Sequence, residues 1–236
     1  MSTTYWSEYL INRIRDVEIC HDPFTHYYLS TAFPWDFYGQ LVTNIPEQGV
    51  FDELRHKDAM QPDGRSTRLQ FNLGQPKHCS RLSEIQRVFW NDVFKGLSSD
   101  ELRIAIFQKL ERDISVRFQC PSVEIPVTPR ILLLRDLPGY RIGVHSDIES
   151  KVVTVQFYLP TSVSQLHLGT RLHRKNAQDS GYVKVKQFHF APNSGYAFAV
   201  TPSNCAHQTI KSWHSVAATN NNDGIRNSLI LTYYQC

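Results

Sequence analysis

Residues 138–147 read PGYRIGVHSD, and the His145-Ser146-Asp147 triplet that ends this stretch determines how the rest of the sequence is interpreted. In an extended segment, the side chains of residues i and i+2 project from the same face. An imidazole and a carboxylate at this spacing converge on one point without backbone strain, and both bind metals. The triplet alone is a weak signal, because surface histidines often lie near an aspartate at a strand end. It gains weight only if further parts of a site follow along the chain.

A third metal ligand is available near the C-terminus, where His214 lies in the segment SWHSV at residues 212–216. Two histidines and one carboxylate can bind iron(II) on one face and leave three coordination positions open for a co-substrate and oxygen. His207, at the end of the segment NCAH, also precedes the last predicted strand and is an alternative ligand. We favour His214 because it lies closer to Arg226. The other histidines are interpreted as surface or packing residues.

An arginine and a serine open the last predicted strand, in the triplet RNS at residues 226–228. A guanidinium group can hold a carboxylate through two parallel hydrogen bonds, and a serine two residues further on shares its face of the strand. Such a pair is what is needed to hold the far carboxylate of 2-oxoglutarate while its keto-acid end reaches the metal. Arg226 and Ser228 are therefore candidate co-substrate ligands.

The second half of the chain has the pattern of short β-strands, rich in β-branched and aromatic residues and bounded by Pro, Gly, Asn or Ser. The predicted strands cover residues 130–135, 152–159, 182–190, 196–200, 208–216 and 226–234. Residues 182–190 alternate along much of their length, which predicts a half-buried strand. Many short strands separated by turns indicate a β-sandwich or jelly roll.

Helical periodicity is confined to the first 120 residues. Apolar residues at spacings of three and four form one stripe at Leu82, Ile85, Val88, Phe89 and Val93, and a second at Leu102, Ile106, Leu110 and Ile114. Ser98 and Glu101 have the capping-box spacing, which predicts that the second of these helices starts there. Shorter helices are predicted around residues 5–18 and 35–44.

Length and composition indicate one globular domain, since 41% of the 236 residues are hydrophobic and 20% are charged. We expect a mainly β protein with flanking helices, in which a helix-rich part (residues 1–125) packs on a jelly-roll core (residues 126–236). A net charge of +3, with no basic cluster interleaved with aromatic residues, gives no reason to expect nucleic acid as a partner. Five scattered cysteines without a CxxC pair, and no signal peptide or membrane segment, predict a cytoplasmic protein without a membrane partner.

Taken together, the segments at residues 138–147, 212–216 and 226–234 resemble the 2-oxoglutarate/iron(II) dioxygenase superfamily. They are similar to its metal-binding strand, its distal-histidine segment and its final co-substrate-binding strand, in that order, and the likeness covers roughly residues 130–234. A weaker likeness begins with HYYL at residues 26–29 and is to small prolyl-hydroxylase-like members.

This resemblance implies a double-stranded β-helix, the cupin-like form of the jelly roll, with Fe(II), 2-oxoglutarate and O2 as cofactor and co-substrates. It implies that His145, Asp147 and His214 bind the metal and that Arg226 and Ser228 bind 2-oxoglutarate. Residues 168–172, LGTRL, resemble the strand after the metal-binding hairpin, so Thr170 is a further 2-oxoglutarate candidate, ahead of Gln156 and Tyr158. The resemblance also implies decarboxylation of 2-oxoglutarate to succinate and CO2. Because halogenating relatives lack the carboxylate, Asp147 favours hydroxylation.

The substrate is expected to be a small molecule, since the chain is compact and modestly charged, with a protein side chain as the alternative. The polar stretch at residues 61–68, QPDGRSTR, could be a mobile lid whose Arg65 or Arg68 meets an anionic group of the substrate. Arg141 is a similar candidate. Ordinary surface arginines would explain the same pattern.

Two other classes of protein fit parts of this pattern. A non-catalytic jelly-roll binding protein would have no chemical reason to keep two histidines, an aspartate and an arginine together. A zinc hydrolase could use the same ligands to activate water, but it gives no role to Arg226 and would act without oxygen.

Overall fold

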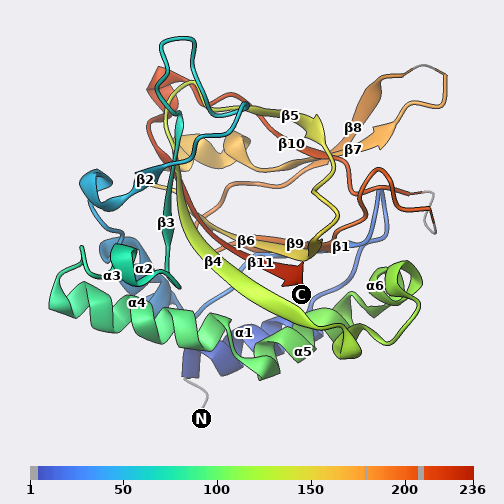
Figure 1. The fold of residues 1–236 in the computed structure, drawn as a ribbon, viewed down its shortest axis with the longest axis horizontal. Helices are drawn as coiled ribbons and strands as arrows, with labels where there is room; N and C mark the ends of the chain where they lie inside the picture. The colour runs from blue at the N-terminus through green and yellow to red at the C-terminus, as the bar shows by residue number, and fades with distance from the viewer. Residues whose placement is uncertain (1–4, 179, 207–209) are drawn as a thin grey trace.

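The computed structural model describes residues 5–178, 180–206 and 210–236 (Figure 1). Its helices are α1 Tyr5–Asp16, α2 Trp35–Thr43, α3 Pro76–Cys79, α4 Glu84–Leu97, α5 Asp100–Lys109 and α6 Glu111–Phe118, with short 3-10 turns η1 Gln48–Val50, η2 Ser122–Glu124, η3 Val163–Leu168 and η4 Asn221–Asp223. Its strands are β1 His26–Leu29, β2 Asp52–Glu53, β3 Arg68–Asn72, β4 Val127–Asp136, β5 Ile142–His145, β6 Lys151–Leu159, β7 Arg171–Lys175, β8 Tyr182–Gln187, β9 Gly195–Ala199, β10 His214–Val216 and β11 Arg226–Gln235.

In this described part of the chain the strands form two antiparallel sheets. The larger has the order β1-β9-β6-β11-β4-β3-β2, and the smaller has the order β5-β10-β7-β8. From β4 onward the chain crosses repeatedly between them: β4, β6, β9 and β11 belong to the large sheet and β5, β7, β8 and β10 to the small one. Figure 1 shows the small sheet above the large one, with α1, α4 and α5 beneath the large sheet. The prediction of a mainly β protein with flanking helices is confirmed.

The two faces of the large sheet differ in chemistry because side chains alternate along each strand. On the helix side, one hydrophobic core joins strand residues such as Val155, Phe157, Leu229 and Leu231 to helix residues such as Leu10, Ile14, Leu102 and Ile106. The alternate residues of the same two central strands face the small sheet, and many are polar: Thr154, Gln156, Arg226, Ser228 and Thr232. A polar face buried between two sheets is the place where a site can form.

Four strand predictions are confirmed, at 130–135, 152–159, 196–200 and 226–234, which fall in β4, β6, β9 and β11. The prediction for 182–190 is wrong in its burial, because nearly all of β8 is exposed. This strand lies at the edge of the small sheet, where neither face is covered.

Two further strand predictions need correction. The strand predicted at 208–216 is only three residues long in β10, and residues 207–209 lie outside the described residues. The first half of the chain, predicted only to cover the sheet with helices, also supplies β1, β2 and β3 to the large sheet. These strands are only four, two and five residues long, so pairing with neighbouring strands is needed to stabilise them.

The two long helical stripes are confirmed in part. The residues Leu102, Ile106, Leu110 and Ile114 are all buried, although the helix divides after Lys109 into α5 and α6. The predicted cap at Ser98 is wrong by one residue, because Ser98 ends α4 while the side chain of Ser99 accepts the backbone N–H of Leu102 at 3.3 Å.

The stripe predicted in α4 is wrong in part, since Ile85 is 79% and Val88 65% exposed. The buried face is formed by Trp90, Val93 and Leu97. Trp90 fixes this orientation, because its large ring is buried and its indole N–H donates to the Asn44 carbonyl at 2.8 Å.

No helix in the described ranges is both long and apolar enough to cross a bilayer.

Candidate functional site

The three predicted metal ligands, His145, Asp147 and His214, come together between the two sheets. β5 and β10 are antiparallel neighbours, and their register places His214 directly opposite His145. Asp147 follows β5 by two residues and is buried, as is His214, while His145 is half-buried. One ligand atom from each of the three residues lies within 4.8 Å of the other two, and no second group of this kind occurs among the residues described.

Both histidines are oriented by backbone carbonyl groups. The Nδ1 atom of His145 donates to the carbonyl of Gly143 at 3.0 Å, and the Nδ1 atom of His214 donates to that of Ser212 at 2.9 Å. A carbonyl group can only accept a hydrogen bond, so the proton lies on Nδ1 and Nε2 keeps its lone pair. This is the tautomer that a metal-binding histidine requires when it uses Nε2.

The carboxylate of Asp147 is held at both oxygens. Thr154 Oγ1 donates to Oδ2 at 2.9 Å, and Lys151 Nζ lies 2.7 Å from Oδ1. Burial raises the pKa of Asp147, but the charge and the hydrogen bond of Lys151 outweigh burial and hold this pKa well below its ordinary value. Burial and the neighbouring His145 lower the pKa of His214 to about 4. Near neutral pH, the cluster therefore presents an ionised carboxylate beside an unprotonated His214.

A second feature of the space between the sheets is a buried charge cluster around Arg226, whose side chain is fully buried. Its Nε donates to the Leu168 carbonyl at 3.0 Å and its Nη1 to Asp136 at 2.7 Å. Arg68 makes a bidentate ion pair with the same carboxylate, at 2.6 and 3.0 Å. Two guanidinium groups share one carboxylate, so the cluster keeps one positive charge. The Nη2 atom of Arg226 is buried and finds no hydrogen-bond partner in the described structure, which is costly unless a ligand provides one.

The other predicted co-substrate ligands, Ser228 and Thr170, belong to one hydrogen-bonded chain of buried side chains. Tyr158 OH donates to Thr170 Oγ1 at 3.1 Å, and Thr170 Oγ1 donates to Tyr196 OH at 3.0 Å. Tyr196 OH donates to Gln156 Oε1, and Gln156 Nε2 donates to Ser228 Oγ, both at 2.7 Å. The ring of Tyr158 also lies 5.6 Å from the Arg226 guanidinium. The structure therefore joins all three polar candidates named from the sequence, Gln156, Tyr158 and Thr170, beside Arg226.

The predicted substrate arginines lie in three different environments. Arg65 is largely exposed and is paired with Asp63 at 2.6 Å. Arg68 is engaged with Asp136 as described above, and Arg141 is exposed at the start of β5. His207, the alternative metal ligand, lies outside the described residues.

Sequence reasoning missed four residues that contact the predicted ligands: Asp136, Lys151, Thr154 and Tyr196. The sequence does offer a reason to suspect Asp136, because a carboxylate that ends the apolar run of β4 needs a partner when it is buried. Lys151 and Thr154 had weaker signals as polar residues four and seven positions after Asp147. No feature of the sequence indicates Tyr196, since tyrosine is common in strands.

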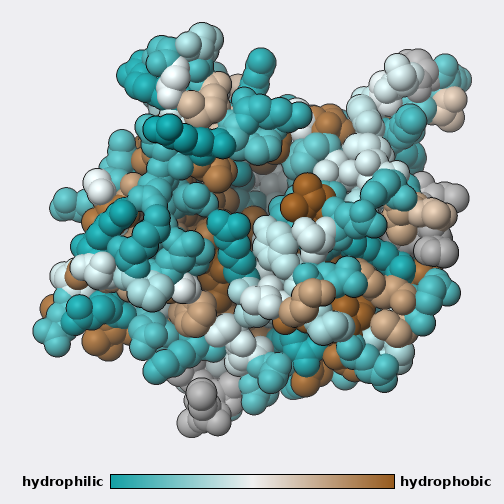
Figure 2. All heavy atoms as spheres, viewed as in Figure 1, coloured by the Kyte–Doolittle hydropathy of each residue, from teal (hydrophilic) through white to brown (hydrophobic). Residues whose placement is uncertain are grey.

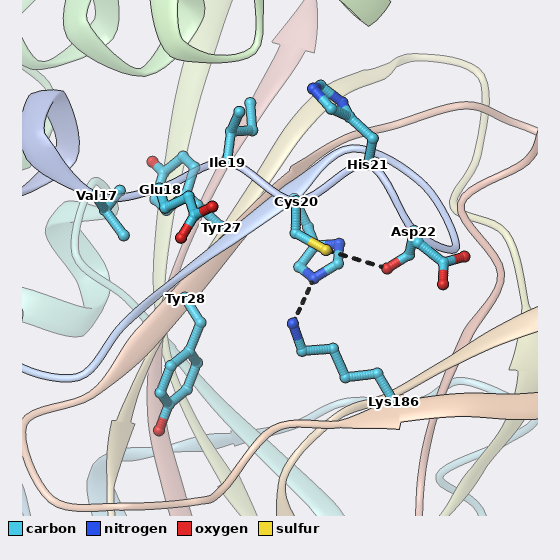
Figure 3. A pocket seen from close by; sticks show the side chains of 10 residues that line it. Val17, Glu18, Ile19, Cys20, His21, Asp22, Tyr27, Tyr28 and Lys186 are labelled. Atoms are coloured by element: carbon cyan, nitrogen blue, oxygen red, sulfur yellow. Dashed lines mark hydrogen bonds between the residues drawn. The ribbon is translucent and has the colours of Figure 1, made fainter.

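A pocket of about 670 Å³ lies apart from these residues, between the segment that joins α1 to β1 and the small-sheet strand β8 (Figure 3). Several of its polar groups bond within the protein, whereas the buried hydroxyl of Tyr27 has no partner in the described structure. Lys186 Nζ lies 3.2 Å from Nε2 of His26, whose Nδ1 donates to the Phe24 carbonyl, and the Cys20 thiol donates to the Asp22 carbonyl. These hydrogen bonds occupy the polar atoms of Lys186, His26 and Cys20, so these three side chains do not indicate a ligand.

Neither a protein-family model nor a curated protein sequence matches the chain. Solved structures do match it. A prolyl-4-hydroxylase from Pseudomonas putida is 14% identical, covers 96% of this chain and 97% of its own, and gives a TM-score of 0.52. A 2OG-Fe(II) oxygenase family oxidoreductase from Burkholderia pseudomallei is 12% identical, with coverages of 99% and 93% and a TM-score of 0.53.

A third match is the non-haem α-ketoglutarate-dependent carbocyclase SnoK of nogalamycin biosynthesis, at 9% identity, coverages of 100% and 87%, and a TM-score of 0.50. The chain has the fold of 2OG-Fe(II) oxygenases. Since the three enzymes act on different molecules or are named only by family, this fold does not specify a substrate.

Proposed function

We propose that this protein is an Fe(II)- and 2-oxoglutarate-dependent dioxygenase that hydroxylates an unactivated C–H bond. The observation that carries the proposal is the convergence of His145, Asp147 and His214 between the sheets that also enclose the unpartnered Nη2 of Arg226. Two imidazole nitrogens and one carboxylate are the ligand set of non-haem iron(II) oxygenases. A zinc hydrolase could use the same three residues, but it has no use for a buried guanidinium group with an unpartnered N–H group.

We further propose that residues 1–236 form a single domain whose core is a double-stranded β-helix. The alternation of β4–β11 between two facing sheets supports this fold. The first part of the chain adds three strands to the large sheet and shares its core with the helices, which supports one folding unit.

Iron would be held by Nε2 of His145, Nε2 of His214 and a carboxylate oxygen of Asp147. When bound, it supplies the activation of O2 that couples oxidation of a C–H bond to decarboxylation of 2-oxoglutarate, giving succinate and CO2. Thr154 and Lys151 orient Asp147 and keep it ionised, which metal binding requires. Asp147 also fills the position that a halide would need, so hydroxylation is favoured over halogenation.

Arg226 would bind the far carboxylate of 2-oxoglutarate, with its free Nη2 as a charge-assisted donor. Ser228 and Thr170 would complete this end of the co-substrate site through the chain of hydroxyl groups that joins them. Tyr158 and Phe190 pack within 5.6 and 4.7 Å of the guanidinium and exclude water from it, which strengthens the ion pair.

The substrate that we propose is a small molecule. A protein side chain is a second candidate, because a prolyl-4-hydroxylase from Pseudomonas putida matches nearly the whole chain. Parallel assays of 2-oxoglutarate turnover with small metabolites and with proline-containing peptides separate the two, since coupled succinate formation should follow only one class.

Anaerobic addition of iron(II) and then 2-oxoglutarate, followed by visible spectroscopy, tests the proposed reaction class. We expect a weak metal-to-ligand charge-transfer band in the wild-type protein, because keto-acid chelation to iron(II) produces one. The band should be lost in His214→Ala and kept in His207→Ala, which is the matched control. Arg226→Gln should require about 100-fold more 2-oxoglutarate for the same band, since the positive charge of the guanidinium and the charge-assisted hydrogen bond from Nη2 are lost.

A folded wild-type protein that binds iron but develops no band would contradict the proposed function. Bound zinc together with activity in the absence of oxygen would then favour a hydrolase.

A further inference from the structure

A pocket of about 960 Å³ lies behind the metal-binding strands, on the opposite side of the small sheet from the candidate iron ligands. We name it the outer-face pocket, and its polar lining includes Lys57, Gln61, Arg141, Arg171, His173 and Ser215. The loop between β2 and β3 closes one side of it, and Figure 1 shows this loop rising beside β5 and β10. Hydrophilic residues predominate on that loop in the space-filling view (Figure 2).

Strand alternation directs the polar side chains of this pocket away from the iron site, although Gly143 and Val216 also contribute to its lining. In β10, His214 faces the space between the sheets and the next residue, Ser215, lines the outer-face pocket. In β7, Leu172 is buried in the core between the sheets, while Arg171 and His173 on either side of it line the pocket. A ligand in the outer-face pocket would therefore contact the same strands as the iron ligands without entering the oxidation site.

Two buried nitrogen atoms of this lining lack a hydrogen-bond partner in the part of the chain that is described: Nε of Arg171 and Nδ1 of His173. The side chain of His173 is 93% buried, because the residue is only 7% exposed, and its Nε2 lies 2.7 Å from Ser215 Oγ. Arg171 pairs with Ser215 in the β7–β10 register, so the two unpartnered groups flank one hydroxyl. Buried polar groups without partners are rare in folded proteins and are commonly satisfied by a ligand or ordered water.

The charges of the lining identify the ligand class. Lys57, Arg141 and Arg171 are cationic, whereas Asp58 is the one acidic residue of the lining and lies 3.3 Å from His56. The lining thus carries two more positive than negative charges. This excess matches a phosphate group, which bears a charge of about −1.5 to −2 at neutral pH, better than a single carboxylate. Arginine also favours phosphate because its planar guanidinium binds two oxygens at once.

We propose that the outer-face pocket binds a phosphate group, with Nε of Arg171 and Nδ1 of His173 as its buried donors and Lys57 and Arg141 at its rim, while the Ser215 hydroxyl donates to Nε2 of His173 and so leaves the ring proton on Nδ1. Its volume exceeds that of inorganic phosphate, so a phosphorylated small molecule fits better than the free ion. The site is distinct from the candidate iron site, since Arg171, His173 and Ser215 project from the face of the small sheet opposite to His214. The proposal does not depend on the proposed oxygenase activity, because it concerns a different face of the sheet.

Isothermal titration and thermal unfolding of the purified full chain test this proposal, with inorganic phosphate and glycerol 3-phosphate as probes at constant ionic strength. We expect saturable binding and a raised Tm with both probes. Arg171→Gln should weaken binding about tenfold or more, because it removes a charge-assisted ligand. Lys57→Gln, an exposed substitution that leaves the core untouched, should weaken it severalfold. Lys186→Gln, a cation of the pocket near His26, is the matched control and should bind as the wild type does.

Tighter binding of glycerol 3-phosphate than of inorganic phosphate would support an organic phosphate ligand, and equal affinities would support the free anion in the same site. Either absence of saturable binding, or equal affinity in wild type, Arg171→Gln and Lys57→Gln, would overturn the proposal. Binding that is lost in Arg226→Gln but kept in Arg171→Gln would overturn it as well, since phosphate would then occupy the space between the sheets.

Discussion

The two faces of the central strands β6 and β11 show how one stretch of sequence serves two purposes. Toward the helices, residues such as Phe157 and Leu231 pack in a continuous apolar core. Toward the small sheet, their neighbours Gln156 and Ser228 are equally buried but are bonded to one another. The apolar face needs only shape and volume to be stable, whereas the polar face needs a partner for every donor and acceptor.

This difference teaches that burial alone does not distinguish core from site. What distinguishes them here is the charge that is buried on the polar face and not fully balanced within the protein. On the polar face the charge cluster of Arg226, Asp136 and Arg68 keeps a positive charge and an unpartnered N–H group, and that imbalance marks the position of a ligand.

The largest effect is expected from an apolar substitution on the helix side. Leu231→Ala removes a fully buried side chain and should lower the free energy of unfolding by about 3 kcal/mol, since it leaves a cavity in a close-packed core. Urea unfolding measures this loss. Iron(II) binding per folded molecule should stay unchanged, because Leu231 points away from the ligands. Weakened iron binding by the folded fraction would show that the two faces are coupled.

The next largest effect is expected from a substitution in the charge cluster of Arg226, Asp136 and Arg68. Arg68→Gln should weaken 2-oxoglutarate binding about tenfold, because the Arg226–Asp136 pair that remains is neutral and attracts an anion less. The double variant Arg68→Gln/Asp136→Asn restores one net positive charge and should recover most of the affinity. Titration of the anaerobic iron(II) protein with 2-oxoglutarate measures both.

Arg65→Gln is the matched control for this experiment, since Arg65 is exposed and is paired with Asp63. If Arg68 instead contacted the substrate directly, as its place in the sequence predicted, Arg68→Gln would leave 2-oxoglutarate affinity unchanged and raise only the KM of the substrate.

An effect of similar size is expected from the hydrogen bond that orients Asp147. Thr154→Val keeps the shape of the side chain and removes the donor to Oδ2, and it should weaken iron(II) binding by about tenfold, the lower end of the range for such supporting groups. Competition with a metal chelator measures the change in affinity. Thr232→Val, the partner of Thr154 in the β6–β11 register, is the control and should leave iron binding unchanged. Equal losses in the two variants would indicate a general disturbance of the sheet.

The convergence of the three candidate metal ligands could be predicted because it depends on local spacing. The HxD triplet, His214 and the arginine that opens β11 each follow from one strand's alternation, and antiparallel pairing of β5 with β10 brings the histidines together. Asp136 was not predicted as part of the site, because its contact with Arg226 depends on β4 pairing with β11, ninety positions apart in the chain. Local patterns do not encode such pairing.

The fold, like the candidate site, could be predicted only where the local sequence decides the structure. The long strands β4, β6, β9 and β11 carry enough apolar and β-branched residues to be recognised alone. The short strands β1 and β3 form because a longer neighbour offers hydrogen bonds, and no window of their own sequence shows that. The stripe of α4 was misplaced because five apolar residues allowed two overlapping faces, and the choice between them depends on what Trp90 contacts.

The smallest effect is expected at Ile85, and it tests which face of α4 is buried. Ile85→Ser should change the free energy of unfolding by less than about 0.5 kcal/mol, because Ile85 is 79% exposed. Val93→Ala in the same helix should cost about 2 kcal/mol, since Val93 is almost fully buried against the core of the large sheet. Urea unfolding of the two variants side by side gives the comparison. Comparable losses at Ile85 and Val93 would restore the stripe predicted from the sequence, which contains both residues.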